Sequence, residues 1–216
     1  MAYKYAPEQA QTRLHAITIQ VGRTGTLTPV AELEPVFVDG STISRATLHN
    51  EEEICRKDIR IGDTVIIEKR GDVIPGVISF VKDLRPAGAE PFDMIAATGS
   101  KCPDCGGAIH KDEEFVAWRC INTDCPAQAA QRLEHFAART ALDIDCLGDI
   151  VSDKLVERQL ASSPLDLFDL TVEHLGPLNL GTDAEPRMFG EKNATKLVDS
   201  VAVSYTHLTL PTNREV

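Results

Sequence analysis

Alternation of apolar and polar positions marks the first part of the chain. In residues 15–21 (HAITIQV) Ile17, Ile19 and Val21 alternate with polar neighbours, and residues 31–34 (AELE) alternate in the same way. This period of two is typical of β-strands with one buried face. The runs at 65–67 and 73–81 predict two more strands, and the pair Asp39-Gly40 predicts a hairpin turn.

A short helical stretch, LHNEEEICRKD at 48–58, lies among these strands. About five short strands with one helix in about 80 residues predict a small closed barrel. Residues 84–101 are rich in Pro, Ala and Gly and are interpreted as a linker. The sequence therefore predicts an all-β module followed by a connection to a second kind of structure.

After Pro126 the apolar residues follow a period of about 3.6, which predicts helices. The first helix carries apolar residues from Ala129 to Ala137, a second runs from Ile150 through Leu155 to Leu160, and a third spans about 192–201. The last residues, 203–216, are Thr-rich and lack this period, so we expect a non-native tail outside the fold. The chain as a whole predicts a multi-domain α+β protein.

Four of the six cysteines fall within 24 residues, as Cys102-x2-Cys105, an excursion of fourteen residues, and Cys120-x4-Cys125. Two short hooks that return to one point are the spacing of a tetrahedral four-sulfur zinc site, and Pro103 with Gly106-Gly107 suits a tight knuckle. Four protein ligands leave no open position, so the expected Zn²⁺ is structural.

Other interpretations of the cysteines stay open. The four could be reduced thiols, the first pair could be a redox pair, and His110 could replace one ligand. Cys55 and Cys146 are expected to be small buried side chains.

The charge argues against a nucleic-acid partner without excluding one. The chain has 22 basic and 33 acidic side chains, a net charge of -11, but residues 1–99 carry 11 and 14 and are close to neutral. Arg23 in a turn, with Lys69 and Arg70 near a strand end, lies where small barrels bind oligonucleotides. The alternative for each is a solvated surface charge.

Two glycine loops precede predicted helices: Leu147-Gly148 after the DID turn, and Phe189-Gly190-Glu191-Lys192. A helix that starts at a tight glycine loop directs backbone N–H groups and its dipole toward a phosphate, with little need for positive charge. An ordinary helical hairpin is the alternative. The chain has neither an apolar run long enough to span a membrane nor a secretory leader, so we expect a cytoplasmic protein without membrane partners.

The strings YKYAPEQ, VGRTGTLTPVAELEPV, SRATLHN, RIGDTVIIEKRGDVIP, CPDCGG, NTDCPAQ and DIDCLGD, in this order, closely resemble bacterial NAD-dependent DNA ligases over about residues 2–202. The resemblance implies an OB-fold barrel, a four-cysteine zinc finger and a helix-hairpin-helix region. It implies an enzyme that seals nicks in duplex DNA during replication and repair. A lysine takes AMP from NAD, the AMP moves to the 5′-phosphate, and the 3′-hydroxyl displaces it with Mg²⁺ or Mn²⁺ assisting.

The resemblance also implies roles for individual residues. Lys4 matches the family's lysine that contacts the nucleotide phosphate, and Arg23 matches its barrel arginine that touches DNA near the nick. Lys69, Arg70, Gly148, Gly190 and Lys192 are further expected DNA contacts. Cys146 stands where the family usually has glycine.

The resemblance is to part of an enzyme. The family's Lys-x-Asp-Gly motif does not occur here, so no catalytic residue is expected in this chain. We expect an internal, monomeric, nucleoid-associated fragment that is inactive alone. Its expected parts are the end of the adenylation domain (1–12), the OB domain (13–92), the zinc finger (100–126), a partial helix-hairpin-helix region (127–202) and the tail (203–216).

Two rival interpretations come from other classes of protein. One is a non-enzymatic OB/zinc-finger module that binds nucleic acid. The other is a zinc-stabilised protein-interaction module with no role on DNA, which the acidity favours.

Overall fold

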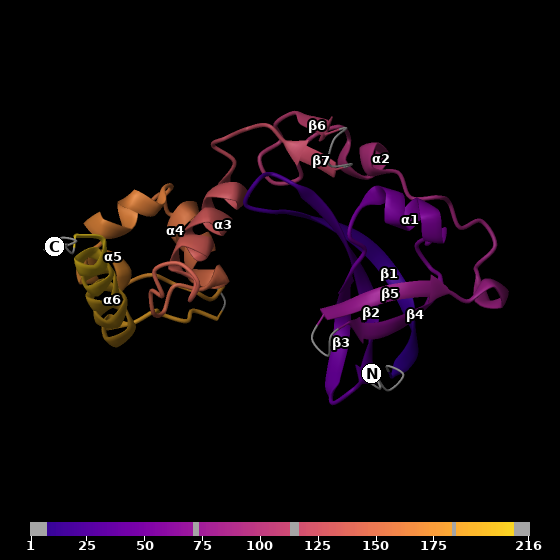
Figure 1. Ribbon diagram of the computed structural model, residues 1–216, viewed down its shortest axis with the longest axis horizontal. Coiled ribbons are helices and arrows are strands. Elements are labelled where there is room, and N and C mark those ends of the chain that lie inside the picture. The colour runs from indigo at the N-terminus through magenta and orange to yellow at the C-terminus, as the bar shows by residue number, and fades with distance from the viewer. Residues whose placement is uncertain (1–7, 71–73, 113–116, 183–184, 210–216) are drawn as a thin grey trace, which may run out of the picture. The chain divides into compact units, whose positions relative to one another are not determined.

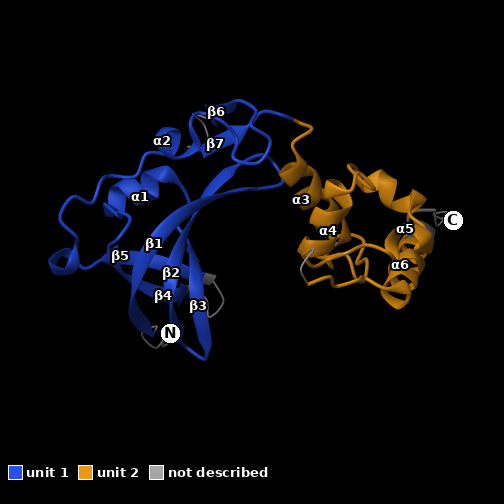
Figure 2. Ribbon diagram, turned by 180° about the vertical axis from the view of Figure 1, so that it is seen from behind, with its two compact units in different colours: residues 1–122 blue, residues 123–216 orange. Residues whose placement is uncertain are grey.

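The computed structural model describes residues 8–70, 74–112, 117–182 and 185–209. Figure 1 shows its elements along the chain, and Figure 2 its two compact units, residues 1–122 and 123–216. Among the described helices, none combines the length and apolar composition needed to cross a lipid bilayer.

The first unit contains a closed five-stranded barrel with strand order β1-β2-β3-β5-β4. The strands are β1 (Gln9–Val21), β2 (Leu27–Val38), β3 (Ser41–Thr47), β4 (Thr64–Arg70) and β5 (Ile74–Phe80). Neighbouring strands are antiparallel except β3 and β5, which meet in parallel at Thr47 and Gly76. This closed barrel, with a helix between β3 and β4, confirms the predicted OB fold.

The alternation seen in the sequence places one face of each strand inside the barrel. Leu14, Ala31, Val65 and Ile67 are fully buried, and the two hairpin residues Asp39 and Gly40 both adopt positive φ, as a tight two-residue turn between twisted strands requires. The first two strands are longer than predicted. Strand β1 starts at Gln9, four residues before the expected barrel boundary, because residues 9–13 pair with β4.

Helix α1 (Glu51–Lys57) occupies the predicted helical stretch. Its first turn is capped by Asn50, whose side chain accepts a 2.8 Å hydrogen bond from the Glu53 N–H, and its buried face carries Ile54. Cys55 lies on the opposite, exposed face, so the expectation that it is buried was wrong. The helical period of about 3.6 residues turns Cys55 away from the buried side of α1 and toward solvent.

The segment interpreted as a linker is more ordered than its composition suggests. It holds the 3-10 turn η1 (Lys82–Leu84) and helix α2 (Met94–Thr98), whose Met94 is buried. Arg85 fixes this segment to the barrel: its guanidinium donates 2.9 Å bonds to the fully buried Asp63 and lies 3.8 Å from the centroid of the Phe80 ring. These contacts are long-range, and a composition argument does not detect them.

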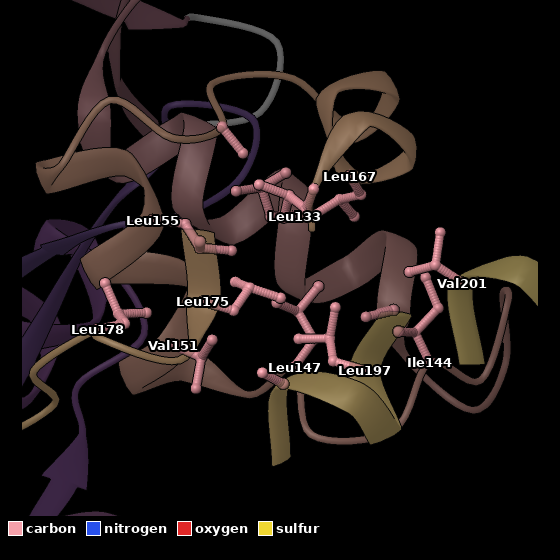
Figure 3. Close-up of a cluster of buried hydrophobic side chains, with 14 of the residues drawn as sticks. Leu133, Ile144, Leu147, Val151, Leu155, Leu167, Leu175, Leu178, Leu197 and Val201 are labelled. Carbon is pink, nitrogen blue, oxygen red and sulfur yellow. The ribbon is translucent and has the colours of Figure 1, made fainter. Parts of the chain in front are cut away.

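The second unit is helical, with α3 (Pro126–Ala137), α4 (Asp149–Glu157), the 3-10 turn η2 (Pro164–Asp169), α5 (Val172–Leu175) and α6 (Glu191–Thr209). Its core collects side chains from each of these elements (Figure 3). The central ones are Leu133, Leu155, Leu167, Leu175 and Leu197, each at most 1% exposed.

Two predicted helix ends differ from the structure. Helix α4 ends at Glu157 because Gln159 adopts φ +54°, and Leu160 therefore follows the helix. Helix α6 does not end near Val201 but continues to Thr209, so residues 203–209 of the expected non-native tail are part of this helix. Ser204 is buried on it, and its hydroxyl donates to the Val201 carbonyl at 2.7 Å. This bond satisfies the buried hydroxyl within the helix.

Candidate metal centre and nucleic-acid interface

The four clustered cysteines meet in space. One sulfur atom from each of Cys102, Cys105, Cys120 and Cys125 lies within 4.8 Å of all the others, and the Cys105–Cys120 pair is 3.6 Å apart. A tetrahedral Zn²⁺ with Zn–S bonds of about 2.3 Å requires sulfur–sulfur separations of about 3.8 Å. The donor set and its size therefore fit zinc, and four protein sulfurs leave no position for a substrate.

The first hook is a knuckle closed by backbone hydrogen bonds. The Gly106 N–H donates to the Cys102 carbonyl at 2.9 Å, and the Cys102 N–H donates to the Gly107 carbonyl at 2.8 Å. Gly106 adopts φ +68°, which glycine tolerates at low cost. The Gly107 N–H lies 3.4 Å from the Cys105 sulfur, the kind of donor that stabilises a thiolate.

The fourteen-residue excursion is a β-hairpin. Strands β6 (Ile109–Asp112) and β7 (Ala117–Cys120) pair with Ile109 opposite Cys120, which returns the chain to the first knuckle. The second hook leads into α3, with Cys125 at the N-cap and Pro126 at the first helical position. The spacing noted in the sequence is thus the length of one hairpin.

The thiols differ in acidity. Burial acts to raise the pKa of Cys105, but hydrogen bonds from the Asn122 side chain and the Gly107 N–H, with those of the neighbouring thiols, lower it to about 7. Burial raises the pKa of Cys120. The polarity around Cys105 favours the thiolate, which is the form that ligates a metal.

The predicted basic residues of the barrel do not form one cluster. Arg23 is exposed in the turn between β1 and β2. Lys69 lies beside the opposite end of β1, because its neighbour Glu68 pairs with Gln9, and its amine donates to the Asp39 carbonyl at 2.5 Å. Arg70 ends β4, and Lys4 falls outside the described residues.

A groove of about 310 Å³ lies on the surface of the barrel. It is lined by residues of four strands: Gln20, Val30, Arg45, Ala46, Thr47 and Pro75. Arg45 is an exposed cation that the sequence analysis missed, although it lies in the quoted SRATLHN string. The pairing of Arg45 with Glu32 between β2 and β3 could have indicated its place on the strand. Closure of the barrel is what brings Pro75 beside Arg45 in the groove.

The two glycine loops of the helical unit start their helices with the same hydrogen bond, although φ is −105° at Gly148 and +81° at Gly190. In each, a buried apolar residue (Leu147 or Phe189) is followed by a glycine whose carbonyl accepts the first helical hydrogen bond, from Ser152 at 2.9 Å and from Ala194 at 3.0 Å. The Gly148 cap offers no side chain to the first turn of α4. Lys192 is exposed in the first turn of α6. The first-turn N–H groups that such loops present suit an anionic oxygen.

Cys146 adopts φ +65° and is half-buried against the helical core. The left-handed conformation that glycine favours is therefore kept by a residue with a Cβ. A positive φ at a residue with a Cβ causes local strain, and the expectation that Cys146 is a buried side chain is met only in part.

Comparison with known proteins agrees with this geometry. The sequence model of the NAD-dependent DNA ligase OB-fold domain matches residues 11–89, and that of the NAD-dependent DNA ligase C4 zinc finger domain matches residues 101–127. A DNA ligase of Akkermansia muciniphila is 54% identical over 200 residues, which cover 93% of this chain and 25% of that protein. A DNA ligase of Desulfosudis oleivorans is 49% identical over 209 residues, 97% of this chain and 29% of that protein. The chain thus spans between a quarter and a third of the length of these relatives.

Proposed function

The chain belongs to the NAD-dependent DNA ligase family, of which it carries the OB-fold and C4 zinc-finger domains, and we propose that it serves as the DNA-gripping part of such an enzyme. The complete enzyme would join a 3′-hydroxyl to a 5′-phosphate at a nick through AMP intermediates, using NAD and Mg²⁺ or Mn²⁺, in replication and repair. The observation that carries this proposal is that one compact unit contains both the closed barrel and the first cysteine knuckle of a four-thiol site.

The zinc of this domain is structural, and we assign its ligands to Cys102, Cys105, Cys120 and Cys125. When bound, the metal joins two short hooks that have too few apolar side chains to fold without it. Purified chain should contain one zinc per molecule, and Cys105→Ser should lower that content. Cys55→Ser, which changes an exposed cysteine outside the cluster, is the matched control. Absence of zinc from the unaltered chain would contradict the assignment.

The barrel is proposed to bind the DNA backbone through Arg23, Lys69 and Arg70, together with the groove cation Arg45. The separation of these cations along β1 suits a ligand longer than a mononucleotide. Because each phosphate contact releases counterions, Arg23→Ala should reduce the slope of log affinity against log salt by about 0.9 on nicked duplex. Arg56→Ala is the control, since that exposed arginine pairs with Glu53 on α1. An unchanged slope would remove Arg23 from the interface.

The glycine loops are proposed to hold the DNA backbone through main-chain N–H groups in the first helical turns that follow Gly148 and Gly190, with Lys192 adding a point charge. Lys192→Ala should weaken duplex binding, measured by fluorescence anisotropy. Lys196→Ala, one turn further along α6, is the control because that amine lies 3.2 Å from the Asp145 carboxylate. Equal effects of the two variants would indicate general charge and not a local contact.

Lys4 is proposed to contact the nucleotide phosphate in the complete enzyme, where the residues that precede β1 would end the adenylation domain. The proposed modules are the barrel to about residue 92, the zinc finger over 100–126 and the hairpin region over 127–202. We place the complete enzyme in the bacterial cytoplasm, on the nucleoid, as a monomer.

Incubation of this chain with labelled NAD should leave no AMP attached. A covalent adenylate would contradict the proposal that the adenylated lysine belongs to another part of the complete enzyme.

A further inference from the structure

The turn that carries Arg23 is built from its own hydrogen bonds. Across residues 22–26, the Gly22 N–H donates to the Thr26 carbonyl at 2.9 Å, and the Gly25 N–H donates to the Gly22 carbonyl at 2.8 Å. The hydroxyls of Thr24 and Thr26 lie 3.1 Å apart. Gly25 is buried at φ +78°, a conformation that other residues rarely adopt. Short turns of this kind are the least stable part of a long hairpin unless something covers them.

The covering element is β7 of the zinc finger. The Cys120 N–H donates to the Gly25 carbonyl at 2.8 Å, and Arg119 forms an antiparallel bridge with Thr26. The backbone of a proposed zinc ligand is thus bonded directly to the turn, two residues from Arg23. Both elements belong to the same compact unit, and Figure 1 shows the β6–β7 hairpin beside the end of the β1–β2 hairpin.

Besides the sulfur cluster, strand β7 is held by its partner β6, by the Arg119–Thr26 bridge and by the hydrogen bond from the Trp118 indole to Glu51. It contains four residues and pairs with a single strand of equal length, and isolated two-stranded hairpins are marginal in water. Its last residue, Cys120, joins the sulfur cluster with Cys105 only 3.6 Å away. Four thiols at this distance repel one another as thiolates unless a cation lies among them. The metal therefore fixes the Cys120 end of β7, while the Trp118 indole holds the strand to Glu51 without it.

We propose that zinc orders the Arg23 turn through the backbone of Cys120. Zinc binding then raises the affinity of the barrel for DNA, because it fixes the DNA-contacting residue Arg23, which is not itself a zinc ligand. This inference rests on the proposed function for its DNA half only. Arg119 and Cys120 act as positioning residues through their main-chain groups, and Arg23 makes the contact.

Hydrogen exchange on the full chain tests the structural half without DNA. On removal of zinc by a chelator, the Gly22 and Gly25 amides should exchange at least about tenfold faster, since local opening is no longer opposed. The Val81 amide, which donates to the Thr64 carbonyl at 2.8 Å elsewhere on the barrel, is the internal control and should keep its protection. Unchanged protection in the turn, or equal loss at Val81, would overturn the inference.

A binding cycle tests the DNA half. Affinity for nicked duplex is measured for the unaltered chain and for Arg23→Ala, each with and without zinc. The substitution should weaken binding about fivefold with zinc and less than twofold without it, because the two perturbations act on one contact. The same factor in both conditions would overturn the coupling. If Arg23→Ala has no effect even with zinc, the proposed DNA contact fails, while the exchange result still decides whether zinc orders the turn.

Discussion

The indole nitrogen of Trp118 donates a 2.9 Å hydrogen bond to the carboxylate of Glu51, which lies 67 residues earlier in the chain. The second oxygen of the same carboxylate accepts a 2.9 Å bond from the Met94 N–H. One side chain on α1 therefore binds both α2 and the zinc-finger strand β7, and it anchors that strand to the barrel at a second point besides the Arg23 turn.

Glu51→Gln should destabilise the first unit by about 1–2 kcal/mol, because an amide has one accepting oxygen for two part-buried donors. Trp118 is the single tryptophan, so its fluorescence during urea unfolding reports on this site directly. Glu52→Gln, on the exposed side of the same turn, is the control and should leave the midpoint unchanged. Equal midpoints for the two variants would contradict the anchoring role.

Arg85→Met should destabilise the barrel by about 3–5 kcal/mol, since it leaves the fully buried Asp63 carboxylate without its cation. The double variant Asp63→Asn, Arg85→Met should recover much of that loss, because no charge then remains buried. Thermal unfolding followed by circular dichroism measures both. If the double variant is as unstable as the single one, packing on Phe80 and not charge burial is the main contribution.

Gly190→Ala should cost the helical unit about 1 kcal/mol, because Gly190 adopts φ +81° and alanine is strained there. Gly148→Ala should be nearly neutral: its φ is −105°, and an added Cβ would meet no described atom within 4 Å. Chemical denaturation of the two variants compares two helix-starting glycines that differ in backbone conformation. Equal losses would mean that the glycines are needed for a reason other than backbone conformation.

Cys146→Gly should be more stable than Cys146→Ala by about 1 kcal/mol, since only glycine relieves the left-handed conformation at φ +65°. Both variants lose the same half-buried sulfur, so their difference isolates the backbone. Denaturation midpoints provide the measurement. Identical stabilities would show that the loop relaxes without strain.

At low pH, one interaction of helix α1 that stabilises the fold should be lost. Hydrogen bonds from Arg56 and Lys57 lower the pKa of Glu53 from 4.5 to about 2, so the carboxylate stabilises the fold above pH 4.5 and loses this effect as the pH falls toward 2. Because the pairs are near the surface, we expect about 1 kcal/mol. The stability difference between the unaltered chain and Glu53→Gln should shrink from pH 7 to pH 3. A difference independent of pH would contradict this assignment.

Local patterns determined much of this protein. The alternation in 15–21, the hairpin at Asp39-Gly40 and the apolar period from Ala129 to Ala137 each reflect interactions between near neighbours, which the order of residues specifies directly. The cysteine spacing likewise predicted the metal cluster, because one hairpin of fourteen residues must return to its starting point.

Tertiary structure decided what depends on distant partners. Nothing local indicated that Glu51 would bind Trp118, that Arg85 would neutralise Asp63, or that closure of the barrel would place Arg45 beside Pro75. The length of α6 was also misjudged: the sequence after Val201 lacks a clear helical period, yet Ser204 is buried there. The contacts of Glu51, Arg85 and Arg45 join residues tens of positions apart, so they exist only once the chain has closed around them.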